Sequence, residues 1–529
     1  MASSLKTIKI SFNGGLDLKS TTQELQSKPG VATELVNFEQ DIAGGYRRIN
    51  GYEKLGTGIV PGTGKLRGVK VYGSGYVACR GEHIYHSFDG ITWLQVNKET
   101  LDLADKTTME SGTEMPRAGT GMYTFDTFTQ GAAGGREDLL IHDADNSPSV
   151  LTVIGTSHET AEYRYVELGI IAKGSQGLVH DDQHVVAGDS TAPSTFYVSS
   201  IADMEDFEGS LSGQYSIAEP IIGMSSFREI LYIFCRNSIW KATDLNNTET
   251  LIEPVTRNVG CIDPATIQEI GGDIIFLATD GLRTLGATER IGDINLTTIS
   301  VPINRLMRDI LQERSAYIFS STVIREKSQY RLFYVDELQP GKTSKGIIAT
   351  FYNNTETPWS FSEIDGMTVT SVNSGVIAGT DVHIHGDTNG RIYRHDVGSY
   401  FDTQNIPWSF QSPSVDLGDV GLRKNMHDLS FYTEQDGIFG MDAKVIYDYD
   451  RGNIHQPALY NIVQLDPPAS WGITPWGTGF WQRRAVTIDE LHVQGSCMTV
   501  AVRLTNNNLN TNPFTIQGFD INYTESGRI

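Results

Sequence analysis

Seven short segments in the first four hundred residues each have the pattern of a β-hairpin, and their spacing constrains the fold more than any other feature. In each segment a run of mostly apolar or β-branched residues leads through a polar turn into a second run. The segments begin at Tyr76, Asp138, His184, Leu231, Asp273, Tyr330 and Val382. Their starts are 62, 46, 47, 42, 57 and 52 residues apart, close to the length of one four-stranded propeller blade.

The middle strands of a blade that stacks between two neighbours bury both faces, so they read as continuous apolar runs. Leu231–Phe234 and Ile274–Leu277 are runs of this kind. Together with the spacing, they favour a β-propeller over a two-sheet sandwich for this part of the chain.

The hairpin repeats stop after Tyr400. From about Asn405 the strands alternate polar and apolar residues, which is typical of a half-exposed antiparallel sandwich. We therefore predict an all-β chain with a β-propeller over residues 61–400 and a C-terminal, sandwich-like antiparallel β-rich platform over 401–529. Residues 1–60 are predicted to be an N-terminal segment that either joins the platform or closes the propeller.

Three segments depart from the strand pattern. Residues 101–135 contain Gly, Thr and Met and few core-forming residues, which predicts a projecting loop inserted in the propeller. Residues 301–313 place Ile303, Leu306, Met307, Ile310 and Leu311 on one face at helical spacing. They predict one short amphipathic helix packed on the outer side of a blade. A short helical turn is also expected near Thr33–Phe38.

Composition limits the compartment and the partners. The four cysteines, Cys79, Cys235, Cys261 and Cys497, are scattered, which indicates buried reduced thiols. No apolar stretch approaches the roughly 20 residues of a membrane span, and the opening residues lack the apolar run of a signal peptide. We therefore expect a chain that is made in a cytoplasm and has no membrane span.

The formal net charge of -23 disfavours a nucleic-acid clamp, because affinity for phosphate comes from clustered Lys and Arg. Acidity does suit a wall along which DNA slides without sticking. It suits simple solubility as well, and net charge alone does not decide between the two.

Local motifs that could carry chemistry have structural explanations. Ser87–Trp93 resembles the Asp-box turn of sialidase-type propellers, which is a fold element there, although one residue is missing between Asp89 and Gly90. Gly62–Leu66 lacks the Gly and the Ser or Thr that a phosphate loop requires. Asp448–Asn453 begins like a calcium loop, but its twelfth position is Leu459 and not Glu.

Two groups of titratable residues remain as candidates. His383 and His385 alternate onto one strand face with His395 nearby, an arrangement that could hold a metal or respond to pH. A glycosidase pair could come from the acids Asp203, Glu205, Asp206 and Glu208 only if the fold brought two of them within about 5 to 10 Å. We interpret these acids as a solvated loop and predict no catalytic, cofactor-binding or metal-binding residue, so the chain is predicted not to be an enzyme.

Three regions resemble the tail nozzle, or tail hub, proteins of short-tailed bacteriophages. The first is Gly30–Gly56, with Asn37, Arg47, Arg48 and the Gly51-Tyr52 step. The second is Ser194–Ala242, where a strand leads through an acidic loop and an Ala-Glu step to an apolar strand. The third is Arg483–Ile529, which is similar to the closing strands of that family. The order of the three regions carries the resemblance, and residues 101–135 are its main departure.

The resemblance implies a propeller and a platform assembled as a homo-hexameric ring in the virion tail, below the portal and the tail adaptor protein. Such a ring would retain the packaged genome and then conduct double-stranded DNA into the host without binding it specifically. Tail fibre, needle or gate proteins would be its other partners, and assembly would take place in the host bacterial cytoplasm. No cofactor is implied.

A rival hypothesis is a propeller that binds or cleaves glycans, with the C-terminal part as a carbohydrate-binding module. Trp471, Trp476 and Trp481 lie close together in the sequence and could stack on sugars. They could equally anchor a subunit interface or the junction between propeller and platform. A fibre-like adhesin is disfavoured, because no heptads are visible.

Overall fold

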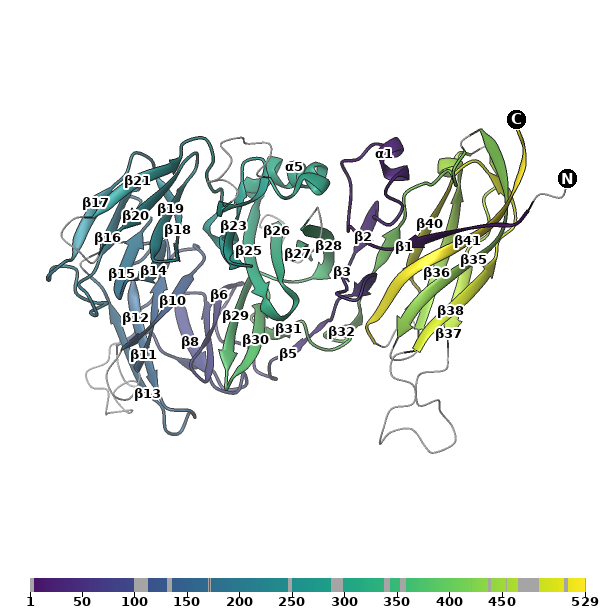
Figure 1. The fold of residues 1–529 in the computed structure, drawn as a ribbon. Helices are drawn as coiled ribbons and strands as arrows, with labels where there is room; N and C mark the ends of the chain where they lie inside the picture. Colours follow the sequence, from purple (N-terminus) through teal and green to yellow (C-terminus); the bar gives the residue numbers. More distant parts are fainter. Residues whose placement is uncertain are drawn as a thin grey trace.

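The structure is a computed structural model of the 529-residue chain. It describes residues 4–98, 113–130, 136–169, 171, 173–245, 250–286, 298–336, 343–352, 358–419, 421–435, 439–452, 454–464, 485–508 and 512–528. The propeller lies at one end of the molecule and the platform at the other, where both termini are found (Figure 1).

The propeller is built from successive antiparallel sheets, in which the first strand of each sheet lies innermost. Four of them have four strands each: β6 (Leu66–Tyr72), β7 (Gly75–Arg80), β8 (His83–Ser87) and β9 (Leu94–Gln95); β10 (Thr124–Gln130), β11 (Arg136–His142), β12 (Ser149–Ile154) and β13 (Glu162–Glu167); β14 (Gln176–His180), β15 (Gln183–Ala187), β16 (Thr195–Val198) and β17 (Gly213–Ser216); β18 (Ile221–Phe227), β19 (Ile230–Cys235), β20 (Ile239–Thr243) and β21 (Leu251–Thr256).

The ring continues through two more separate sheets and one shared sheet. The separate ones are β22 (Gln268–Ile270), β23 (Asp273–Ala278) and β24 (Gly281–Thr284), and β29 (Ser371–Ile377), β30 (Thr380–Gly386) and β31 (Ile392–His395) with β5 (Tyr52–Lys54), β32 (Tyr400–Phe401) and β33 (Gln404–Asn405). Between them stand β25 (Tyr317–Ile324), β26 (Gln329–Asp336), β27 (Ser344–Phe351) and β28 (Trp359–Met367). Six sheets are therefore self-contained blades, and the β25–β28 set completes the ring, with β25 in contact with both β22 and β29.

All seven predicted hairpin segments begin in the second strand of a set, so the propeller prediction is confirmed. The physical reason is visible in β19, where Leu231–Cys235 is buried on both faces between neighbouring blades. The four cysteines are buried and free, as predicted.

The platform consists of two packed sheets. The first joins β3 (Phe38–Gln40), β4 (Tyr46–Arg48), β41 (Phe514–Arg528), β35 (Leu422–Gln435) and β38 (Ala485–His492), with β1 (Lys6–Ser11) beside β41 and β39 (Ser496–Cys497) beside β35. The second runs through β2 (Glu34–Val36), β34 (Ser409–Gln411), β40 (Val500–Asn506), β36 (Phe439–Tyr447) and β37 (Tyr460–Gln464). Between them the ring of Phe12 lies 4.4 Å from that of Phe410 and 5.6 Å from that of Phe519.

The second platform sheet is continuous with the propeller, because β2 pairs with β28 at Val36 and Glu363. The N-terminal segment serves both parts of the molecule. Its strands β1 and β4 pair with β41, whereas β5 pairs with β31 and adds a strand to the last blade. Both roles that the sequence left open for residues 1–60 are therefore present.

The loop predicted over residues 101–135 is wrong for its second half. Thr124–Gln130 is β10, the inner strand of a blade, and it pairs with β11 from Thr124 opposite His142 to Gln130 opposite Arg136. Arg117 upstream of it is fully buried and donates a hydrogen bond to the carboxylate of Asp143 at 2.9 Å. Residues 99–112 and 131–135 lie outside the described residues.

The helix predicted over residues 301–313 is confirmed as a short 3-10 turn, Val301–Ile303, followed by α5 (Asn304–Gln312). Its buried residues Ile303, Met307 and Ile310 face the outer strand β24, so the helix covers the blade that has only three strands. The turn predicted near Thr33–Phe38 is wrong, since β2 and β3 form there. A five-residue helix, α1 (Thr22–Gln26), precedes them and begins with a capping box of Thr21 and Glu24. No described helix is long and apolar enough to cross a membrane.

Candidate functional site

The inner strands of the propeller surround a cavity of about 800 Å³ at its axis. Strands β10, β14, β18, β22, β25 and β29 all contribute to its lining. Hydroxyl and amide side chains are frequent there: Ser175, Gln176, Ser225, Ser226, Gln268, Ser320, Ser321, Ser371 and Asn373. The acidic side chains in the lining are Asp126, Asp263 and Glu269.

Two of these acids are tuned towards protonation. The carboxylate of Asp126 accepts hydrogen bonds from the backbone N–H groups of Thr127 and Val179, each at 2.8 Å, but burial outweighs them and raises its pKa. Asp263 caps the 3-10 turn Pro264–Thr266 by accepting from the N–H of Ala265 at 2.9 Å. Burial raises the pKa of Asp263 to about 6. A carboxylic acid in this range can act as a general acid near neutral pH.

No sequence motif marks these two aspartates. Asp126 lies in the stretch predicted to be a loop, and Asp263 precedes a Pro in a turn. What distinguishes the two residues is that each lies on the innermost element of its blade, beside the axial cavity. That position becomes known only when the arrangement of the blades is known.

The candidate histidines are brought together by β30 and β31. Nδ1 of His395 lies 3.3 Å from Nδ1 of His385, and Nε2 of His395 accepts a hydrogen bond from Arg331 at 3.0 Å. Burial lowers the pKa of His385 to about 3. Burial and Arg331 hold the pKa of His395 well below its usual value, so both rings are neutral. Among the described residues, no group of three or more His, Cys, Asp or Glu side chains is placed to hold a metal ion.

The acids Asp203, Glu205, Asp206 and Glu208 belong to the loop between β16 and β17, and they do not line the axial cavity. Glu205 forms an ion pair with Arg164 on β13. Asp206 accepts hydrogen bonds from the N–H groups of Glu208 and Gly209 at 2.9 and 3.0 Å. None of the acids predicted as a solvated loop lines the axial cavity.

In the remaining sequence motifs, the polar groups make hydrogen bonds that stabilise turns and neighbouring loops. Asp89 accepts hydrogen bonds from the N–H groups of Ile91 and Thr92 at 2.8 and 2.9 Å in the turn between β8 and β9. In Gly62–Leu66, the carbonyl of Gly64 accepts from Arg80 at 2.8 Å. Asp448 accepts from the N–H groups of Met498 and Thr499, at 2.8 and 2.9 Å. Trp471, Trp476 and Trp481 lie outside the described residues.

A buried ion network joins the propeller to the platform, and the sequence did not predict it. Arg331 on β26 is fully buried, and its Nη2 lies 3.2 Å from Glu39 on β3 and 3.0 Å from Asp396 after β31. Lys327 reaches the same two carboxylates at 2.9 and 2.8 Å. Burial opposes the charge of Asp396, but Arg331 and Lys327 outweigh it and hold its pKa below the usual value. Two cations thus balance two anions out of water.

The residues of the first nozzle-like region stand at the same junction. Asn37 has a left-handed backbone, with φ of 58°, and it is fully buried. Its side chain donates to the carbonyls of Asp365 and Pro407 at 2.8 and 2.5 Å and accepts from the N–H of Asp365 at 3.0 Å. A Cβ on Gly51 would lie 1.8 Å from the carbonyl oxygen of Tyr400. Arg48 is buried, and it donates to the carbonyl of Ser399 at 3.2 Å.

This geometry defines a propeller protein with a polar axial cavity and a platform fixed rigidly to one side. Neither a protein-family model nor a curated protein matches the chain. Among solved structures, it is similar to AFV00434, an ancestral GH74 enzyme (TM-score 0.37, 10% identity, 71% of this chain and 51% of that one). It therefore spans about half the length of that structure.

Two further similarities are of the same kind. The N-terminal domain of Nup159 matches with a TM-score of 0.31 and 11% identity, over 70% of this chain and 90% of that one. An exo-beta-1,3-galactanase from Phanerochaete chrysosporium matches with a TM-score of 0.26 and 10% identity, over 90% of this chain and all of that one. At such identities the likeness concerns the fold alone.

The prediction that this chain is not an enzyme is corrected by these similarities. Glycoside hydrolases are among the solved structures to which the chain is similar, at identities of 9 to 10%. The prediction rested on finding no catalytic motif in the sequence. Asp126 and Asp263 are not part of any such motif. The absence of a motif in the sequence is therefore no evidence against a catalytic role.

Proposed function

We propose that this chain is the subunit of a tail nozzle in a short-tailed bacteriophage, assembled as a hexameric ring through which the genome is retained and then ejected. The observation that carries the proposal is the way the resembling regions meet. The first and third regions pair in one platform sheet, where β4 lies against β41, and the second region supplies β16 to β20 of the propeller. A propeller with such a platform is the fold that the resemblance implies.

The junction suits a subunit under mechanical load. A nine-stranded sheet runs from β25 in the propeller to β37 in the platform, and the ion network of Glu39, Lys327, Arg331 and Asp396 ties its strand β26 to β3 of the other platform sheet. A continuous hydrogen-bonded sheet transmits force between the two parts with little local opening. A ring that holds pressurised DNA needs subunits of this kind.

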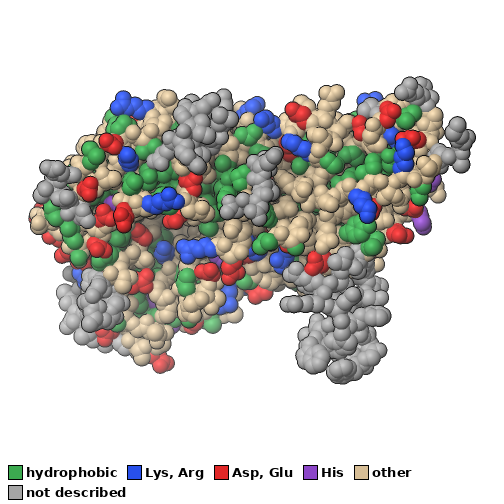
Figure 2. Space-filling model, viewed as in Figure 1, with side chains coloured by type: hydrophobic (Ala, Val, Ile, Leu, Met, Phe, Trp, Pro, Cys, Tyr) green, Lys and Arg blue, Asp and Glu red, His purple; other side chains and the backbone are tan. Residues whose placement is uncertain are grey.

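The surface charge is compatible with passage of DNA. Acidic and basic side chains are mixed over both parts of the face shown in Figure 2, with no extended patch of Lys and Arg. Within a chain of net charge -23, such a surface gives phosphates few places to bind strongly. The tail adaptor and the fibre, needle or gate proteins are the partners that this proposal expects.

The test is the mass of the purified chain by native mass spectrometry, alone and mixed with a tail adaptor protein. We expect six copies, either alone or on addition of the adaptor, and a ring with a central opening in negative-stain images. A chain that stays monomeric under both conditions would contradict the proposal.

A second candidate function is glycan binding or cleavage in the axial cavity. The observation in its favour is the pair Asp126 and Asp263, which share one polar cavity and both have raised pKa values. Two carboxyl groups on either side of a glycosidic bond are the apparatus of most glycoside hydrolases. Incubation with a panel of oligosaccharides tests it. Turnover that disappears in Asp263→Asn and persists in Asp309→Asn, an exposed acid on α5, would support this function.

A further inference from the structure

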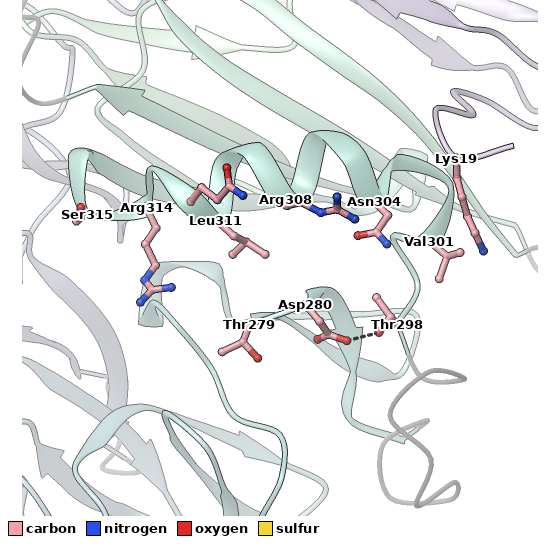
Figure 3. Close-up of a pocket in the computed structure, with 11 residues that line it drawn as sticks. Lys19, Thr279, Asp280, Thr298, Val301, Asn304, Arg308, Leu311, Arg314 and Ser315 are labelled. Atoms are coloured by element: carbon pink, nitrogen blue, oxygen red, sulfur yellow. Dashed lines mark hydrogen bonds between the residues drawn. The ribbon is translucent and has the colours of Figure 1, made fainter. Parts of the chain in front are cut away.

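A second cavity, of about 780 Å³, lies beside α5, between the N-terminal segment and the blade of β22 to β24. Three basic side chains line it, and they come from separate segments: Lys19 precedes α1, Arg308 lies on α5, and Arg314 follows α5. Figure 3 shows Arg314 towards one end and Lys19 towards the other, with Arg308 and Asn304 between them on the helix.

The three cations have no anionic partner within the described part of the chain. No hydrogen bond or ion pair joins the side chain of Lys19, Arg308 or Arg314 to any residue there. All three side chains are exposed to solvent. Like charges gathered in a concave site repel each other unless an anion lies among them.

The one carboxylate in the lining does not neutralise them. Asp280 is held by Arg283, whose Nε and Nη2 donate to its two oxygens at 2.9 and 2.6 Å. The hydroxyl of Thr298 donates to it as well, at 2.8 Å (Figure 3). The charge of Asp280 is therefore already balanced, and the cavity keeps an excess of three positive charges.

The neutral groups of the lining are suited to the same ligand chemistry. Thr279, Asn304, Gln312 and Ser315 offer hydrogen-bond donors. Guanidinium groups match the oxygen geometry of phosphate in two-point contacts. A volume near 780 Å³ lies in the usual range of small-ligand sites.

We propose that this cavity binds a phosphate-bearing ligand with at least two anionic groups, held by Lys19, Arg308 and Arg314. The phosphates can belong to a small phosphorylated molecule or to the backbone of a nucleic acid. This assignment does not depend on the ring, because every group that carries it belongs to one chain.

The experiment is isothermal titration of the full chain with inorganic tripolyphosphate at low salt. The double variant Arg308→Gln/Arg314→Gln should weaken binding at least about tenfold, because it removes both two-point contacts. The matched control is Arg305→Gln, an exposed arginine of the same helix outside the cavity lining, which should change binding by less than about twofold. Thermal unfolding of each variant checks that the fold is kept.

Two results would overturn the proposal: no binding of tripolyphosphate to the unmodified chain at millimolar concentration, or an equal loss in Arg305→Gln, which would indicate general charge attraction. A competition arm identifies the source of the phosphates. Displacement of tripolyphosphate by a short DNA duplex points to a nucleic-acid backbone, and its retention points to a small ligand.

Discussion

The propeller and the platform reach buried cores by opposite routes through the sequence. In the propeller, paired strands are neighbours in the chain, as where Ala78 lies opposite Tyr85, except where β5 joins the last blade. In the platform, the pairing partners come from the two ends, as where Ile8 lies opposite Ile521 and Arg47 opposite Thr515. Closing a long loop costs more conformational entropy than closing a hairpin. The blades can therefore form locally, whereas the platform forms only when the chain ends meet.

The platform therefore depends on its attachment to the propeller. Strand β2 is held between β28 and β34, so the N-terminal segment that supplies β1 and β4 to the platform is tied directly to the propeller. Changes at the junction should therefore destabilise the platform more than equal changes within a blade do.

The largest effect is expected from Arg331→Met. This change leaves Glu39 and Asp396 buried with only Lys327 to balance them, and breaking a buried pair in this way costs about 3–5 kcal/mol. Urea unfolding measures the loss, and hydrogen exchange should show faster exchange in β3 and β41 than in β19. Arg394→Met, at an exposed position of β31, is the control and should cost under about 0.5 kcal/mol. Equal losses in the two variants would refute the role of the network.

Asn37→Ala is expected to be next in size. It removes three hydrogen bonds of a buried side chain, leaves their partners unsatisfied and puts Cβ-bearing Ala at positive φ, for a total cost of about 2–4 kcal/mol. Asn37→Gly loses the same bonds but tolerates the backbone, so it should cost about 1 kcal/mol less. Chemical denaturation separates the two contributions, and a smaller loss in Ala than in Gly would show that the positive φ at this position carries no strain.

The features that could be predicted from the sequence are the local ones, and those that were missed depend on contacts between distant parts of the chain. The seven hairpins, the strand-rich C-terminal part and the helix near Met307 were found because each is a local pattern. The ion network was missed because Arg331 and Glu39 are 292 residues apart and no periodicity connects them. Strand β10 was missed because its Thr and Phe residues follow a Gly- and Thr-rich stretch that resembles a loop. The cavity beside α5 was missed for the same reason as the network, since Lys19 and Arg308 meet only in the fold.

Gly51→Ala tests how closely β5 must approach the last blade. An added Cβ would meet the carbonyl oxygen of Tyr400 at 1.8 Å, so the backbone must shift, at a cost of about 1–3 kcal/mol. Gly452→Ala, where an added Cβ would have nothing within 4 Å, is the matched control and should be nearly neutral. Thermal melting compares them. A harmless Gly51→Ala would indicate that the closing strand is loosely held.

The smallest effect is expected from Asp263→Asn, which tests the axial cavity of the propeller. This variant should gain stability, and the gain should depend on pH. The folded pKa of Asp263 is raised from 3.8 to about 6, so the folded state binds the proton more tightly and stability falls as pH rises between those values. Asn keeps the cap on Ala265 without the buried charge. We therefore expect the variant to be more stable at pH 7 by about 1–3 kcal/mol, since the whole change in pKa corresponds to at most about 3 kcal/mol. The advantage should vanish near pH 4, where Asp263 is protonated in the folded chain. Urea titrations at the two pH values measure it, and an advantage that is independent of pH would show that burial of the charge is not its cause.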